Sequence, residues 1–166
     1  VVALYDHTTR NEIFRFRPFP GFMNGLNVAL GDVNGDLFVD IVVGAGQGGG
    51  PHVRVFSGRD GEPLYDFFAY DGRFTGGVRV AVGNLDGDNA MDIITATGPG
   101  SNHVRAFRGA QRTEITHLSI MPYGGFAGGT NIAAGDVNGD GIDDIITVPG
   151  AGGGPHVRVF NGRNGG

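Results

Sequence analysis

The chain has 166 residues, no cysteine and a net charge of −5. It can therefore hold no disulfide, zinc-thiolate centre or thiol nucleophile, and its charge argues against a nucleic-acid partner. No apolar stretch approaches the ~18 residues that cross a bilayer, so membrane insertion is not expected. The N-terminus lacks the pattern of a signal peptide, so any export signal has been removed or was never included.

A period of 52 residues organises the chain, and each full period predicts four strands. The 33 glycines lie between these runs, which are rich in Val, Ile and Phe, so we expect an almost helix-free, all-β protein. The first run is apolar and small, at 27–30, 78–82 and 131–134. The second is an unbroken β-branched run typical of a strand buried on both faces, at 40–44, 92–96 and 144–148.

The third and fourth runs complete each period. The third alternates polar and apolar residues at 51–56, 102–107 and 155–160, and the fourth covers 63–68 and 114–120. Residues 2–5 align with the third run and 12–16 with the fourth. The expected units within one domain, 1–166, are therefore a partial unit at 1–20, full units at 21–72 and 73–124, and a partial unit at 125–166.

Nearly the same decapeptide joins the first run to the second in each period, at 31–40, 83–92 and 135–144. Each copy places oxygen-bearing side chains at loop positions 1, 3, 5 and 9, and these positions hold nine of the seventeen acidic residues. Three bound divalent cations would change the net charge from −5 to +1. The pattern predicts a calcium loop that leads into a strand, three times over.

Two alternatives to this interpretation exist. An EF-hand needs a glutamate at position 12 and a following helix, but that position is Val43, Thr95 or Thr147, inside a β-branched run. Acidic Asx turns without metal are the second alternative, and the threefold recurrence of one spacing argues against it.

The Phe-x-Gly-Gly segments, the Gly-Asp-Val-Asn-Gly-Asp-x-x-x-Asp loops and the following Ile-Val-Val-Gly-Ala-Gly run resemble the FG-GAP repeat. That family builds the β-propeller of integrin α subunits and of bacterial surface and secreted proteins. The resemblance covers essentially the whole chain. It implies blades of four antiparallel strands, a calcium ion in each Asp/Asn loop, and a secreted or cell-surface location.

Carried over to this chain, the resemblance implies about three calcium ions. The implied side-chain ligands are Asp32, Asn34, Asp36 and Asp40; Asn84, Asp86, Asp88 and Asp92; and Asp136, Asn138, Asp140 and Asp144. Position 7 would add a main-chain carbonyl, from Phe38, Ala90 or Ile142. The second loop departs from the pattern because Asn84 replaces aspartate at position 1, which puts its affinity in question.

Three blades do not make a closed propeller, because 4–8 are usual. We expect a homodimer that closes a ring of about six blades and shares strands between chains, with a surplus third-run strand displaced, paired elsewhere or disordered. The alternative is a piece excised or engineered from a longer array.

The expected function is a binding or scaffold module for an extracellular protein or glycan, and not an enzyme. A propeller-fold polysaccharide-processing enzyme is the alternative, which would need a non-repeated polar cluster. His52, His103 and His156 recur at one position, each followed two residues later by arginine. This recurrence favours a structural contact with the next blade over a catalytic role.

Overall fold

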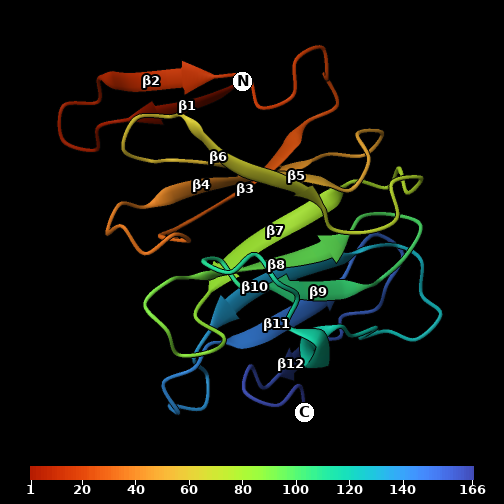
Figure 1. Cartoon of the computed structure of the whole chain (residues 1–166). Helices are drawn as coiled ribbons and strands as arrows, with labels where there is room; N and C mark the ends of the chain where they lie inside the picture. Colours follow the sequence, from red (N-terminus) through yellow and green to blue (C-terminus); the bar gives the residue numbers. More distant parts are fainter.

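Antiparallel strand pairs make up nearly all the regular structure in the computed structural model, which describes residues 1–166. Twelve strands form four small sheets, and the single helical segment is the 3-10 turn η1 (Thr116–Leu118). The expectation of an all-β, almost helix-free protein is confirmed. The sheets follow one another from the N-terminus to the C-terminus (Figure 1).

Each sheet is an antiparallel meander in sequence order. The first is the hairpin of β1 (Val2–Tyr5) and β2 (Glu12–Phe16). The second contains β3 (Leu26–Gly31), β4 (Asp40–Ala45), β5 (His52–Phe56) and β6 (Pro63–Phe68). The third contains β7 (Val78–Gly83), β8 (Asp92–Thr97) and β9 (Val104–Phe107), and the fourth β10 (Thr130–Gly135), β11 (Asp144–Pro149) and β12 (Arg158–Phe160). The arrangement is consistent with propeller-like blades.

The first strands of successive sheets lie side by side. β3 contacts β7, and β7 contacts β10. These strands carry small residues because their backbones approach closely. A Cβ on Gly83 of β7 would lie 2.6 Å from the Cβ of Ala134 in β10, so a larger residue there would push the strands apart.

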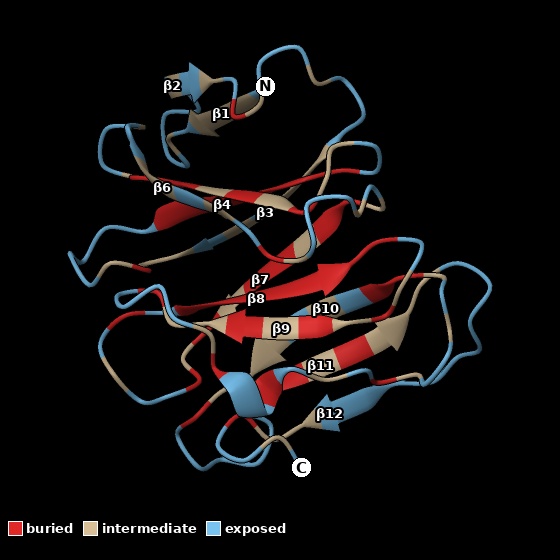
Figure 2. Ribbon diagram, turned by 45° about the vertical axis from the view of Figure 1, so that its right-hand side comes forward, coloured by how far each residue is buried: buried red, intermediate tan, exposed pale blue.

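The hydrophobic core lies between the sheets. β4 and β8 are buried along their whole length, as expected for strands covered on both faces (Figure 2). One cluster between the second and third sheets includes Val53, Val55, Val80 and Ile93. A second cluster, between the third and fourth sheets, includes Ile94, Val104, Leu118 and Ile145.

Two predicted strands differ from the structure. Residues 114–120 were expected to form a strand, but only isolated bridges at Glu114 and Ile120 pair with β9, and η1 lies between them. The turn directs both Ile115 and Leu118 into the core, a spacing of three that a strand of period two cannot give. The last third-run strand is also shorter than expected: β12 begins at Arg158, and no fourth strand lies beside it.

The structure contains no helix with the length and hydropathy needed to span a membrane.

Candidate functional site

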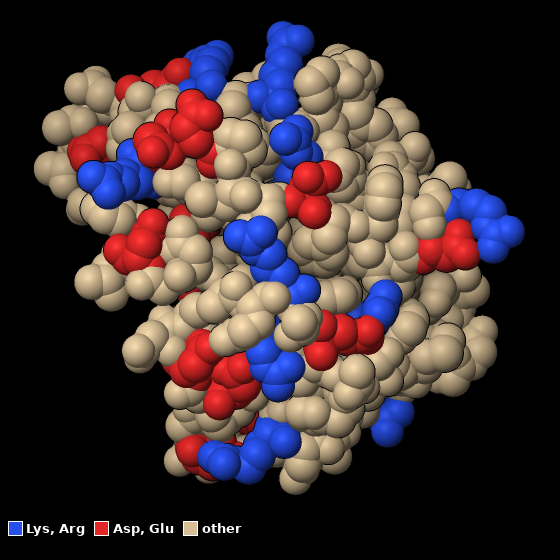
Figure 3. Space-filling model, viewed as in Figure 1, with Lys and Arg blue, Asp and Glu red and all other residues tan.

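The three acidic loops occupy the same place in their sheets. They join β3 to β4, β7 to β8 and β10 to β11, and all three lie on one side of the molecule (Figure 1). Asp and Glu side chains gather along that side, with arginines among them (Figure 3). The strand register is identical at each loop, since Gly31 faces Asp40, Gly83 faces Asp92 and Gly135 faces Asp144.

The side chain at loop position 1 shapes the turn. Asp32 Oδ1 accepts hydrogen bonds from the N–H groups of Gly35 (2.7 Å) and Asp36 (3.1 Å), and Oδ2 accepts one from Leu37 (2.7 Å). Asp136 accepts the same three bonds in the third loop, which lowers its pKa; the bond from Gly141 is the main cause. Gly35 adopts φ +79°, a conformation that favours glycine.

Side chains at positions 3 and 5 also accept backbone N–H groups two residues ahead. Asn34 Oδ1 accepts from Asp36 (2.9 Å), and Asp36 Oδ1 accepts from Phe38 (2.9 Å). The third loop repeats both bonds, from Asp140 to Asn138 and from Ile142 to Asp140. In the second loop, Asp86 and Asp88 accept from Asp88 and Ala90. Each loop therefore carries Asx-type turns in succession.

The aspartate at position 9 is buried in every copy: Asp40, Asp92 and Asp144. Its Oδ2 accepts a hydrogen bond from the backbone N–H at position 2, for example from Leu85 to Asp92 (2.8 Å). Its Oδ1 accepts a hydrogen bond from the backbone N–H of the glycine after the third strand, for example from Gly109 to Asp92 (3.2 Å). Burial raises the pKa of Asp40, and it raises that of Asp92 to about 6. These carboxylates fasten the loop to the turn after the third strand of the same sheet.

The donor chemistry of the loops fits calcium, a hard cation that prefers carboxylate, amide and carbonyl oxygens. The geometry does not bring the carboxylates together: no three His, Cys, Asp or Glu side chains converge as a metal site would require. The oxygens at positions 1, 3 and 5 instead accept the loop's own N–H groups. A carboxylate oxygen has two lone pairs; Asp32 Oδ1 accepts two of these bonds, but Oδ2 accepts one and keeps capacity for a cation.

The three loops differ in their surroundings. In the second, Asn84 Nδ2 donates to the carbonyl of Asp88 (3.1 Å), and Arg108 Nε donates to Asp86 Oδ2 (3.0 Å). In the third, Arg163 Nε lies 3.9 Å from Asp140 Oδ2. No arginine pairs with a carboxylate of the first loop. The second loop is therefore the least suited to a cation, because Arg108 donates a hydrogen bond to one of its carboxylates, whereas Arg163 lies farther from Asp140.

Neighbouring loops are joined by hydrogen bonds that the sequence did not predict. The N–H of Met91, at position 8 of the second loop, donates to the carbonyl of Asp32 (2.7 Å). The N–H of Asp143 donates in the same way to the carbonyl of Asn84 (2.8 Å). The Asp143 carboxylate also accepts the N–H of Asn84 (2.8 Å), and its only signal in the sequence was an extra acidic residue at position 8.

The repeated histidines and arginines make structural contacts, but with the preceding sheet and not with the next one as expected. Each arginine donates through Nη1 to a carbonyl in the segment that joins the preceding sheet to the first strand of its own sheet: Arg54 to Pro18, Arg105 to Ala69 and Arg158 to Pro122. The histidine rings contact aromatic rings of the same preceding segments, at centroid distances of 5.2, 5.4 and 5.9 Å for Phe19–His52, Tyr70–His103 and Tyr123–His156.

In a comparison with known families, the model of the family described as FG-GAP-like repeat matches residues 84–147. This segment runs from the second acidic loop through β8, β9 and β10 to the third loop and into β11. The match confirms the resemblance seen in the sequence. A comparison with curated proteins found no match.

Proposed function

We propose that this FG-GAP repeat protein is a calcium-stabilised β-propeller module that serves binding or scaffolding and not catalysis. The observation that carries the proposal is the threefold recurrence of one acidic loop at one position in three sheets. A catalytic site needs a unique arrangement, whereas a structural ion is needed once in every blade.

The residues that would hold calcium are the oxygen donors of positions 1, 3, 5, 7 and 9. A bound cation would offset the mutual repulsion of these carboxylates and the cost of burying the aspartate at position 9. Its binding free energy would therefore add to folding stability. We place the module outside the cell, where millimolar calcium suits loops of modest affinity.

The test is thermal unfolding of the calcium-loaded protein, with and without a chelator. At free calcium 100 times the Kd, each occupied site stabilises the fold by about 2.7 kcal/mol. The chelator should lower Tm, calcium should restore it, and magnesium should restore less because it prefers stricter octahedral geometry. A melt that the chelator leaves unchanged would refute the calcium role.

We further propose that a second copy of the chain completes a ring of about six blades. Both end sheets expose apolar surface. At one end, Val157 and Val159 are 61% and 45% exposed beside the free edge of β12. At the other, Val28 on β3 is 47% exposed, whereas the equivalent Val80 on β7 is 9% exposed under the preceding sheet.

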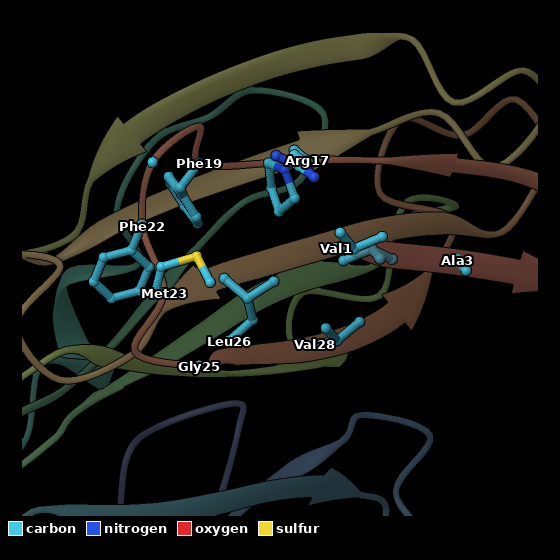
Figure 4. A pocket seen from close by; sticks show the side chains of 12 residues that line it. Val1, Ala3, Arg17, Phe19, Phe22, Met23, Gly25, Leu26 and Val28 are labelled. Carbon is cyan, nitrogen blue, oxygen red and sulfur yellow. The ribbon is translucent and has the colours of Figure 1, made fainter.

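The exposed end at β3 forms an apolar groove of about 680 Å³ between the first hairpin and the second sheet. Figure 4 shows Met23, Leu26 and Val28 along one side of this groove and Val1 near the other. The surface of β3 continues the type of interface that β7 and β10 make inside the chain. A second copy is therefore the occupant that this surface suits, through the open face of its β10–β12 sheet.

Light scattering with calcium should give twice the monomer mass of 17.3 kDa. A stable monomer at all concentrations would exclude closure by a second copy. This measurement is separate from the calcium melt, so either part of the proposal can fail alone.

The residues that break the repeat support binding or scaffolding over an enzyme. Arg73 pairs with Asp71 (2.9 Å), Arg112 lies over the Tyr65 ring (4.4 Å), and His117 contacts the Gly162 carbonyl (3.2 Å). Arg10 lies in the exposed turn between β1 and β2. They are scattered over separate local contacts, whereas a polysaccharide-processing enzyme would gather such groups in one groove. The ligand we expect is an extracellular protein or glycan.

A further inference from the structure

A polar pocket of about 290 Å³ lies at the end of the inner strands opposite the acidic loops. Its walls come from the turns before β3 and β7 and the turns after β4 and β8. Arg79 is the only charged residue that lines it, in a chain with seventeen acidic residues. The pocket is therefore a positively charged site within an acidic protein.

Arg79 has no carboxylate partner. Its Nη1 donates to the carbonyls of Thr97 (3.2 Å) and Thr130 (3.1 Å), while Nε and Nη2 make no hydrogen bond. Five other arginines pair with acids, among them Arg105 with Glu114 and Arg108 with Asp86, whereas Arg54 and Arg158 bond carbonyls as Arg79 does. Burial lowers the pKa of Arg79, because removing the charged guanidinium from water costs solvation free energy.

Arg79 also breaks the repeat. The equivalent positions are Asn27 and Asn131. Asn27 Nδ2 donates to the carbonyl of Val78 on the next inner strand (2.9 Å), and Arg79 makes the matching bond to Thr130. Asparagine is therefore sufficient for this junction, and the sheets do not require the additional guanidinium group. A Cβ on Gly129 would lie 2.7 Å from Arg79 Nη1, so glycine leaves space for that group.

The other residues that line the pocket are uncharged. Asn24, Asn27 and Gln47, which carry side-chain amide groups, are among them. The backbone N–H groups of Gln47, Gly76 and Gly77 donate no hydrogen bond within the chain. A guanidinium fork matches the two oxygens of a carboxylate, and amide groups can bond hydroxyls.

We infer that this pocket binds the carboxylate of a small hydroxylated acid, such as a sugar acid, with Arg79 as the anion-binding residue. The volume is near the lower limit of ligand pockets, which suits one monosaccharide unit. All the lining residues belong to one chain and none lies in an acidic loop, so neither calcium nor a second copy supplies a group to the site. An open pocket of this kind predicts weak binding, with a Kd on the order of 1 mM.

The test is a titration of ¹⁵N-labelled protein, kept in calcium, with sodium glucuronate, glucose and sodium sulfate. Glucuronate should shift the amide signals of Gln47, Gly76 and Gly77, and glucose should not. Equal shifts with glucose, or none with glucuronate, would overturn the inference. Shifts with sulfate alone would also overturn it, in favour of an inorganic anion site.

Arg79→Asn is the decisive variant, because it restores the residue that the repeat has at positions 27 and 131. It should keep the wild-type melting temperature and weaken glucuronate binding at least tenfold. Arg10→Asn is the matched control: it makes the same charge change in an exposed turn at φ +60°, which asparagine tolerates, and binding should be unchanged. If Arg79→Asn does not fold, Arg79→Lys is the second variant, because lysine keeps the positive charge but lacks the bidentate guanidinium group. Undiminished binding by a folded Arg79 variant would refute the assignment.

Discussion

Two identical hexapeptides, Pro-His-Val-Arg-Val-Phe at 51–56 and 155–160, lie in different surroundings. In the first, β5 pairs with β4 and β6, and Val53 and Val55 are fully buried. In the second, only Arg158–Phe160 form a strand, paired on one edge, and Val157 and Val159 are largely exposed. The same six residues therefore form a longer and buried strand only where strands pair with both of its edges, so the neighbouring strands matter as much as the sequence.

The same two segments agree on the side that faces the preceding sheet. Arg54 lies 5.1 Å from the Phe56 ring centroid and Arg158 lies 5.3 Å from that of Phe160. Each arginine also donates to a proline carbonyl of the preceding segment. The two copies differ in the later part of the chain, because β6 and the third sheet come after the first copy and no further sheet comes after the second. The last sheet thus keeps its contacts with the segment before it and lacks a following sheet to cover its other face.

The largest expected difference in stability is between the variants Val53→Asp and Val157→Asp. The first places an unpaired carboxylate in the core and should destabilise the chain by about 4 kcal/mol or more. The second should change monomer stability by no more than about 0.5 kcal/mol but abolish the proposed dimer. Circular-dichroism melts and light scattering measure the two effects. Equal destabilisation of the monomer by both variants would contradict the comparison.

A smaller effect should separate Asp36→Ala from Asp88→Ala. Asp36 belongs to a loop in which no arginine pairs with a carboxylate, so its replacement should remove about 2 to 3 kcal/mol of calcium-dependent stability. Asp88→Ala should remove less than half of that, because the second loop has Asn84 and the Arg108–Asp86 pair. Calorimetric titration with calcium gives the stoichiometry of each variant. The reverse order would show that arginine pairing does not weaken the second loop.

Tyr70→Phe and Tyr123→Phe form the next pair. The Tyr70 hydroxyl bonds Thr95 (3.1 Å) and the His103 carbonyl (2.9 Å), and burial raises its pKa. Tyr123 makes the same bonds to Thr147 and His156 at the exposed end. Tyr70→Phe should cost about 1 to 2 kcal/mol and Tyr123→Phe less than about 1, because water can replace the latter's bonds. Urea unfolding measures both, and equal losses would show that the end sheet is as well covered as the interior.

The smallest expected effect concerns Glu114, which pairs with Arg105 on the interior third strand. Its hydrogen bond to Arg105 is the main reason that the pKa of Glu114 is lowered. The stability from this shift is present above the unfolded pKa of about 4.3 and is lost as pH falls through the folded value. Glu114→Gln should therefore cost at most about 1 kcal/mol at pH 7, and less at pH 3. A loss that does not vary with pH would rule out the ion pair as its source.

The sequence predicted the repeated features well. The second-run strands at β4 and β8 were expected as buried, and the acidic loops lie between first and second strands as the period required. The sequence-based prediction failed where one repeat folds differently from the others. Ile115 and Leu118 enter the core from a 3-10 turn, whereas the period predicted a strand there because the previous copy has one, β6.

For the candidate site, the sequence predicted which side chains would be donors, which stays a prediction, and it did not predict how the loops hold them. Positions 1, 3, 5 and 9 were recognised from spacing, but the hydrogen bonds between successive loops involve backbone groups that carry no sequence signal. Arg79 was visible as a departure from Asn27 and Asn131. Only the structure shows that Arg79 lines a pocket without acidic residues, because that pocket is formed by turns from different parts of the chain.

The hydrogen bonds between loops give the array a direction. Position 8 of each loop donates to position 1 of the loop before it, as Met91 does to Asp32 and Asp143 to Asn84. The N–H of Val39 and the carbonyl of Asp136 are the unused donor and acceptor at the two ends. A further repeat can therefore join only head to tail. Its loop would supply a carbonyl acceptor for the N–H of Val39 at one end, or an N–H donor for the carbonyl of Asp136 at the other. Duplication of this unit within a gene would lengthen the array without any new residue at the junction.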